Sequence, residues 1–117
     1  MSENLRGKAS VPFRLSLPGS SGDAATLMGH TRDMRATGLS LIVPDIRLGE
    51  EEITVEDRAL SVVLELPSGT VEMEVTPVRH ERLDAEAAEQ GFLIGVRITE
   101  ISDSDCVRFV KYLRALR

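Results

Sequence analysis

Tryptophan is absent from this chain of 117 residues, which also has one tyrosine, three phenylalanines and a single cysteine. So few aromatic side chains disfavour a stacking platform for single-stranded nucleic acid, and the core must be built from Leu, Val, Ile and Met. The lone Cys106 excludes an intramolecular disulfide and a cysteine-based zinc site, which fits a reducing compartment. No run approaches the roughly 18 apolar residues of a membrane span, and residues 1–10 lack the apolar centre of an export signal. We therefore expect a cytoplasmic protein without membrane insertion.

Positive charge is also scarce, because 14 Lys and Arg stand against 19 Asp and Glu, for a net charge of −5. This balance disfavours DNA and RNA as partners, since broad phosphate contact needs a cationic surface. The charge is uneven: residues 1–47 carry +2, residues 48–105 carry −11 and residues 106–117 carry +4. A small anion would therefore be accommodated better near the N-terminal segment than over the acidic middle.

Residue patterns for catalysis and for metal binding are missing as well. His30 and His80 are the two histidines, and they lie in no H-x-x-x-H or H-E-x-x-H pattern, so we expect no metal site. There is no Gly-x-Ser-x-Gly or P-loop spacing, and the acidic run 50–52 is typical of a solvated turn. We expect no enzymatic activity and no cofactor.

What the chain does have is repeated alternation of apolar and polar side chains, the pattern of half-buried strands. Six segments show it: 11–17, 26–32, 37–43, 60–66, 71–78 and 92–98. Pro77 predicts a bulge or an edge in the fifth segment. Segment 45–59 is polar and predicts a long loop, with one short strand around Ile53 and Val55, whereas segment 82–90 predicts a hairpin loop with one helical turn.

The last segment changes to the spacing of an amphipathic helix. Ser102 is a good N-cap for a helix over residues 103–116, acidic residues occupy its first turn and basic residues its last. We expect this helix to dock on the strands, with Cys106 on its apolar face as a small core residue. The fold class is therefore all-β: a six-stranded antiparallel β-barrel over 11–117 with a C-terminal helix, preceded by a flexible lead-in, residues 1–10.

The segment 31–43 combines polar turn chemistry with the start of an apolar strand. Asp33 supplies an acceptor for planar N–H groups, and Gly38 permits a left-handed or closely approached backbone. Leu39 and Leu41 then alternate as in a half-buried strand. Two interpretations fit this pattern: a ligand-binding shelf built on a sheet, or an ordinary hairpin with a turn over 33–38.

The order of the predicted elements, this segment and the final helix together resemble the PilZ family. The family signature Asp/Asn-x-Ser/Ala-x-x-Gly is matched by Asp33 and Gly38, with Arg35 at the Ser/Ala position, and the segments 67–69, 78–79, 95–98 and 109–113 also resemble the family's later half. The resemblance implies a barrel that binds cyclic di-GMP, with Asp33 accepting guanine N–H groups.

The family's other signature, Arg-x-x-x-Arg before the first strand, is matched by Arg6 but has Ser10 at its second position. In the family both arginines contact phosphate and guanine through a planar guanidinium, which serine cannot supply. The resemblance therefore implies a ligand-binding set of Arg6, Asp33, Arg35 and Gly38, with weakened affinity. We hypothesise that Arg35 swings outward and replaces the missing phosphate contact.

Two functions follow from the resemblance. The first is a bacterial second-messenger receptor domain that binds cyclic di-GMP and signals to a protein partner or a fused effector. The alternative is a degenerate PilZ-like interaction module that binds no dinucleotide. A third interpretation, which rests on charge and needs no ligand, is a protein-interaction domain whose acidic band, residues 50–89, recognises a basic partner. An open groove beside Asp33 would favour the first, and a filled one the second.

Overall fold

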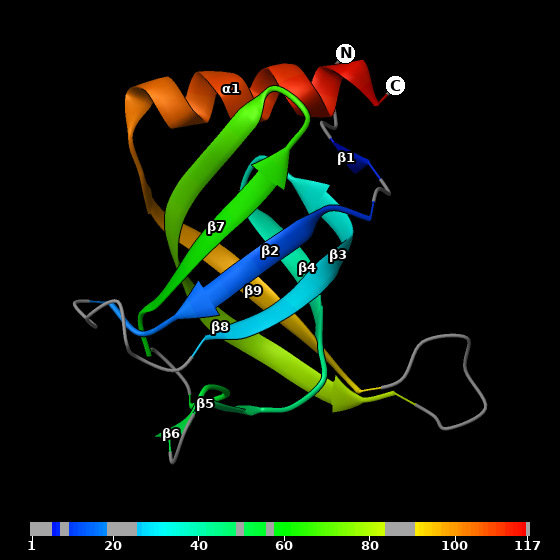
Figure 1. Cartoon of the computed structure of the whole chain (residues 1–117), viewed down its shortest axis with the longest axis vertical. Helices are drawn as coiled ribbons and strands as arrows, with labels where there is room; N and C mark the ends of the chain where they lie inside the picture. The colour runs from blue at the N-terminus through cyan, green and yellow to red at the C-terminus, as the bar shows by residue number, and fades with distance from the viewer. Residues whose placement is uncertain are drawn as a thin grey trace.

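A computed structural model describes residues 6–7, 10–18, 26–48, 51–55, 58–83 and 91–116, and six long antiparallel strands form its frame (Figure 1). They are β2 (Pro12–Ser16), β3 (Leu27–Arg35), β4 (Gly38–Val43), β7 (Leu60–Leu66), β8 (Gly69–Arg82) and β9 (Phe92–Ile101). Neighbouring strands pair in the order β3-β2-β7-β8-β9-β4, and β4 pairs back with β3. The sheet is therefore closed, and the predicted six-stranded barrel with one C-terminal helix is confirmed.

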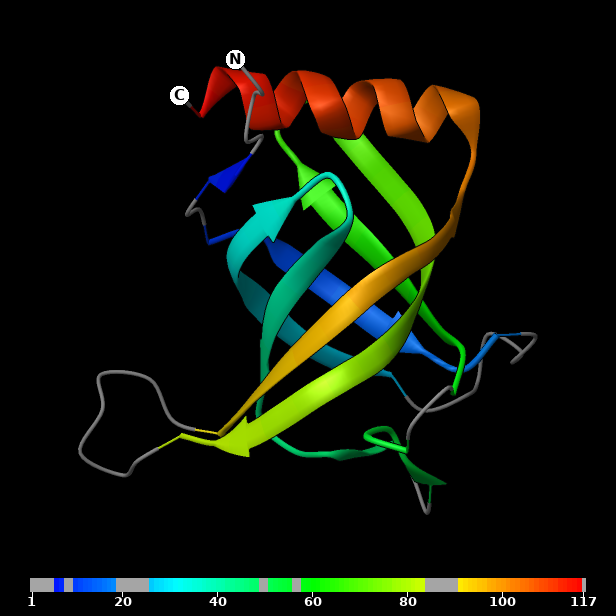
Figure 2. The same cartoon turned by 180° about the vertical axis from the view of Figure 1, so that it is seen from behind.

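Three short strands and one helix complete the described chain. The two-residue strand β1 (Arg6–Gly7) pairs with the end of β3, while β5 (Arg47–Leu48) and β6 (Glu51–Glu52) form a separate small ribbon. Helix α1 (Asp103–Ala115) lies across one end of the barrel in both views (Figures 1 and 2). Of the predicted lead-in, residues 1–5 and 8–9 lie outside the described part, and β1 is the paired segment within it.

The barrel interior is filled with aliphatic side chains, as the poverty in aromatic residues predicts. Fully buried residues from every long strand meet there, among them Phe13, Leu15, Met34, Leu41, Leu60, Leu64, Val71, Val75 and Ile94. Because such an interior is close-packed, a ligand has to be bound on the outer wall or at an end of the barrel.

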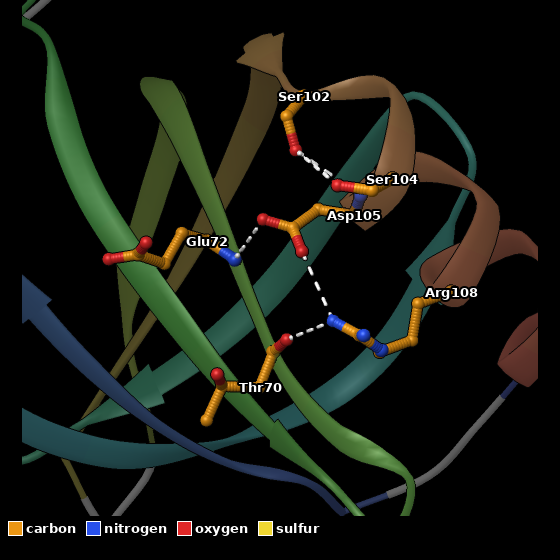
Figure 3. Close-up of polar contacts among 6 residues, drawn as sticks. All are labelled: Thr70, Glu72, Ser102, Ser104, Asp105 and Arg108. Carbon is orange, nitrogen blue, oxygen red and sulfur yellow. Dashed lines mark hydrogen bonds and ion pairs between the residues drawn. The ribbon is translucent and has the colours of Figure 1, made fainter.

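Helix α1 closes the end of the barrel by apolar packing and by hydrogen bonds to β8. Its residues Phe109 and Leu113 face the barrel and are 1% and 0% exposed. Figure 3 shows the polar contacts: Asp105 accepts from the backbone N–H of Glu72 at 3.2 Å, and Arg108 donates to the carbonyl of Thr70 at 2.9 Å. The N-cap assigned to Ser102 is confirmed, because its hydroxyl accepts from the N–H of Asp105. Within the described residues, no helix has the length and apolarity needed to cross a membrane.

The predicted turn over 33–38 is wrong, since β3 continues to Arg35 and the turn contains Ala36 and Thr37 alone. A bulge explains the error. The pairing of β3 with β4 shifts between Thr31 and Asp33, so the alternation is broken inside the strand and resumes with the buried Met34. In the sequence this break looks like the end of a strand.

Other boundaries also differ from the sequence-based prediction. Ile53 lies in a turn and not in a strand, where its N–H donates to the carbonyl of Ile46 and its side chain is fully buried. Cys106 is half-buried and not a core residue. The bulge predicted at Pro77 is confirmed by a shift in the β8–β9 pairing between Pro77 and Arg79. Residues 84–90 of the predicted hairpin loop lie outside the described part.

Candidate functional site

A pocket of about 490 Å³ lies on the outer wall of the barrel, over strands β3, β4, β8 and β9. It is lined by Asp33, Arg35, Thr37, Gly38, Leu39, Val78, Arg79, Gly95, Val96 and Arg97. Three of the residues predicted from the sequence, Asp33, Arg35 and Gly38, therefore share one hollow. The groove beside Asp33 is open.

Strand register places one row of residues across this pocket. Asp33 of β3 pairs with Ser40 of β4, Ser40 pairs with Gly95 of β9, and Gly95 pairs with Arg79 of β8. A carboxylate and a guanidinium thus stand at opposite ends of a row whose middle has only a hydroxyl and a glycine. These small residues leave space for a ligand at the centre of the row.

A second row runs two residues further along the same strands. Arg35 of β3 pairs with Gly38 of β4, which pairs with Arg97 of β9. On its other side β3 pairs with β1, and there Arg35 lies opposite Arg6. The fourth predicted site residue is thereby brought beside the pocket through its backbone position.

Asp33 reaches the outer wall because of the bulge in β3. Thr31 is buried in the barrel, and regular alternation would turn Asp33 inward as well. With one extra residue between them, Asp33 is half-buried at the surface, where its Oδ1 accepts from the hydroxyl of Ser40 at 3.3 Å. A carboxylate has about four lone-pair sites, so Asp33 keeps acceptor capacity for a ligand.

The two glycines allow close approach in different ways. Gly38 does not have a positive φ, so of the two uses of a glycine that the sequence left open, the closely approached backbone is the one found. An ideal Cβ there would lie 2.5 Å from the carbonyl oxygen of Val96. At Gly95 a Cβ would instead meet a side chain, with Arg79 Cγ at 2.9 Å and Nε at 3.0 Å. The side chain of Arg79 therefore lies over the bare backbone of Gly95.

The pocket is cationic although the chain as a whole is acidic. Its lining carries Arg35, Arg79 and Arg97 against Asp33, three positive charges and one negative. Among the described residues, none of these three exposed guanidinium groups has a hydrogen bond or an ion pair. Arg108 on α1 differs, because it is engaged by Thr70 and by Asp105. Unpaired guanidiniums around a shallow floor are suited to binding an anion.

Arg79 and Arg97 are site residues that the sequence analysis did not assign. They are two of four basic residues within the acidic segment 48–105. In the alternating segment 92–98, Arg97 falls between the apolar Val96 and Ile98, a position that predicts an outward side chain. The missing information was which strands are neighbours. Once β9 is placed beside β4 and β8 beside β9, both arginines lie within the same pocket as Asp33.

A second hollow, of about 480 Å³, lies between α1 and the β7–β8 turn, and we call it the helix groove. Its lining includes Pro67, Val107, Lys111 and Tyr112, and Val107 is 58% exposed. It has no carboxylate, and its one arginine is the engaged Arg108. The pocket at Asp33 is the better candidate for a polar ligand, because charged groups of both signs converge there without mutual pairing.

The lining of the Asp33 pocket is poor in groups that exchange protons near neutral pH. It has a single carboxylate and neither histidine nor cysteine, so it offers no pair of titratable groups for acid–base work. In the described part of the chain, no three His, Cys, Asp or Glu residues are grouped so that they could hold a metal ion.

Comparison with known proteins places these features in a family. The sequence matches the PilZ domain family over residues 3–115. Comparison with curated proteins gives no match.

Three solved structures share the fold at low sequence identity. The PilZ domain of YcgR from Escherichia coli, solved with c-di-GMP, is 11% identical with a TM-score of 0.68, and the alignment covers 98% of this chain and 90% of that one. The inhibitor of motility MotI/DgrA of Bacillus subtilis is 14% identical with a TM-score of 0.69, over 97% of this chain and 49% of its own. MrkH, described as a c-di-GMP-dependent transcription regulatory factor, is 14% identical with a TM-score of 0.70, over 99% of this chain and 51% of its own. This chain thus spans about half the length of MotI/DgrA and of MrkH.

Proposed function

This chain belongs to the PilZ domain family, and from that premise we propose that it binds cyclic di-GMP in the pocket at Asp33 and acts as a second-messenger receptor domain. The observation that carries the proposal is the convergence of one carboxylate with three unpaired guanidiniums over a floor that contains Gly38 and Gly95. The solved YcgR domain, which has the same fold, contains c-di-GMP.

The chemistry of the ligand matches that of the pocket. Cyclic di-GMP has two phosphodiesters, each with one negative charge, and two guanines that present N–H donors. The carboxylate of Asp33 accepts such donors, while guanidinium groups take phosphate oxygens through a planar fork. The excess of two positive charges in the lining equals the negative charge of the ligand.

Within this proposal the predicted residues keep distinct roles. Asp33 holds a guanine edge, Arg35 contacts a phosphate, and Gly38 lets β4 lie close to β9. Arg6 follows from the family signature, and its backbone position beside Arg35 supports a role at the same ligand. Ser10 supplies no guanidinium, so we expect affinity to be lower by about ten-fold or more than in a pocket with both lead-in arginines.

The receptor role also requires an output. We propose a cytoplasmic bacterial domain that passes ligand binding to a protein partner or to a fused effector. Two relatives that are about twice as long as this chain support such an arrangement. The single cysteine is in keeping with a reducing compartment.

Replacing Asp33 tests the proposal directly. We expect Asp33→Ala to weaken cyclic di-GMP binding by about ten- to a hundred-fold in calorimetric titration, because a charge-assisted acceptor for guanine is removed. The matched control is Glu65→Ala, which removes an exposed carboxylate from β7 outside the pocket and should leave affinity unchanged. Absence of binding by the unsubstituted chain would reject the proposal and favour the interaction module.

A further inference from the structure

We propose that Arg79 of β8 contacts a phosphate of the ligand from the wall opposite Arg35, and so makes up, together with Arg35, for the arginine that is missing at Ser10. This inference rests on the proposed function and adds a residue to its binding site. It starts from the position of Arg79, which shares one row with Asp33 across β3, β4, β9 and β8.

A bulge in β8 turns Arg79 toward the pocket. Val75 and Pro77 are buried, so regular alternation would turn Arg79 into the barrel as well. The shift in pairing between Pro77 and Arg79 prevents this and leaves both Val78, 60% exposed, and Arg79 at the surface. Bulges commonly re-aim a side chain at a functional site.

The same device operates at the other end of the row. The bulge between Thr31 and Asp33 turns the carboxylate outward on β3, as the bulge before Arg79 turns the guanidinium outward on β8. Two independent irregularities thus place opposite charges on the same outer face at one register. Adjacent strands are about 4.8 Å apart, so the two Cα atoms are about 14 Å apart along the sheet, a span that one dinucleotide can bridge.

Gly95 determines where the guanidinium of Arg79 can lie. Because Gly95 has no Cβ, the side chain of Arg79 rests over β9, toward the side on which β4 carries Ser40. An alanine at position 95 would meet Cγ and Nε of Arg79 at about 3 Å. Arg79 is therefore held low over the pocket floor and has no protein acceptor in the described residues, which leaves its N–H groups for an anion.

Arg97 is the other unassigned cation, and its position differs. It belongs to the second row, two strands from Arg35 with Gly38 between them. It therefore lies outside the row that runs from Asp33 to Arg79, whereas Arg79 ends that row on the wall opposite β3. Substitutions at the two positions separate these roles.

The test is calorimetric titration of cyclic di-GMP into the unsubstituted chain and into Arg79→Ala, Arg79→Lys, Arg97→Ala and Arg14→Ala. Arg14 is the matched control, an exposed arginine on the outer face of β2 that does not line the pocket. We expect Arg79→Ala to lose about ten-fold or more in affinity, Arg79→Lys to recover part of it because the charge but not the fork is kept, and Arg14→Ala to change nothing. Arg97→Ala should lose less than Arg79→Ala.

A second substitution tests whether the phosphate contact of Arg79 replaces the contact of the arginine that is missing at position 10. Ser10 is exposed just before β2, and Ser10→Arg in the Arg79→Ala chain should restore most of the lost affinity. If the unsubstituted chain binds and Arg79→Ala binds within about two-fold of it, the inference is overturned while the proposed function stands. A loss that Ser10→Arg does not reverse would overturn the replacement role. No binding by the unsubstituted chain would overturn both proposals.

Discussion

At the scale of single residues, Gly38 and Gly95 both form the pocket floor, yet a methyl group would meet different neighbours at the two positions. At Gly38 it meets the backbone oxygen of Val96, which is fixed by the β4–β9 pairing. At Gly95 it meets the side chain of Arg79, which can rotate away. The first glycine is needed for the fold, and the second for the position of one arginine.

We therefore predict that Gly38→Ala lowers the free energy of unfolding by about 1–3 kcal/mol, because the strands must separate to relieve the overlap. Gly95→Ala should change it by less than about 1 kcal/mol, since a flexible side chain yields. Urea unfolding of both variants measures this difference. Equal losses of stability would contradict the packing described for Gly38.

Arg35 stands where the family has serine or alanine, and the sequence leaves open whether it blocks the ligand or binds it. The structure gives it an exposed side chain without a protein partner in the described part of the chain, which favours binding. Arg35→Ser should then weaken cyclic di-GMP binding by about ten-fold. Arg32→Ser is the control on the same strand, exposed but outside the pocket. Equal or tighter binding by Arg35→Ser would show that the arginine is an obstacle.

At the scale of elements, α1 is held to β8 by hydrogen bonds of Asp105 and Arg108. Asp105 accepts from the N–H of Glu72 through one oxygen and from Arg108 through the other, and Arg108 continues to the carbonyl of Thr70 (Figure 3). The helix is thus joined to the start of the strand that later carries Arg79. The buried helix residues Phe109 and Leu113 supply the apolar part of the same contact.

Asp105→Ala should lower the free energy of unfolding by about 1–2 kcal/mol, since two hydrogen bonds are lost, one of them to a charged group. Asp103→Ala, in the same first turn but exposed, should lose less than about 0.5 kcal/mol through the helix dipole alone. Chemical denaturation of the pair measures the contribution of the cross-element bonds. Similar values for the two variants would contradict a fastening role for Asp105.

The elements that the sequence predicts well are those with an unbroken period. The helix predicted over 103–116 and the strand predicted over 60–66 are found almost as predicted. Apolar residues recur at every turn of the helix and at every second residue of the strand. The end of β3 was missed because a bulge interrupts alternation at Asp33. A bulge depends on pairing with another strand, and a single segment of sequence does not contain that information.

The site was predictable only in part for the same reason. Asp33, Arg35 and Gly38 are close in sequence, so a local signature brings them together. Arg79 and Arg97 come from distant segments, and they reach the pocket through the strand order β8-β9-β4.

At the scale of the whole molecule, closure of the barrel brings together charges that are far apart in the sequence. In the sequence, the N-terminal segment 1–47 looked more favourable for an anion than the acidic segment 48–105. The fold places two of the four basic residues of that middle segment beside Arg35, so the pocket combines cations from both regions. Local potential in such a cleft depends on these positions more than on the net charge of −5.

Mapping of backbone amide shifts by NMR during titration with cyclic di-GMP tests the central claim most directly, because it reports binding and its location together. The account predicts saturable shifts at Asp33, Gly38, Gly95 and Arg97, with the amides of the helix groove, such as Val107, unchanged. Shifts centred on the helix groove would contradict it. So would the absence of a saturable shift at about 1 mM ligand, since a Kd of that size corresponds to a binding free energy of only about −4 kcal/mol.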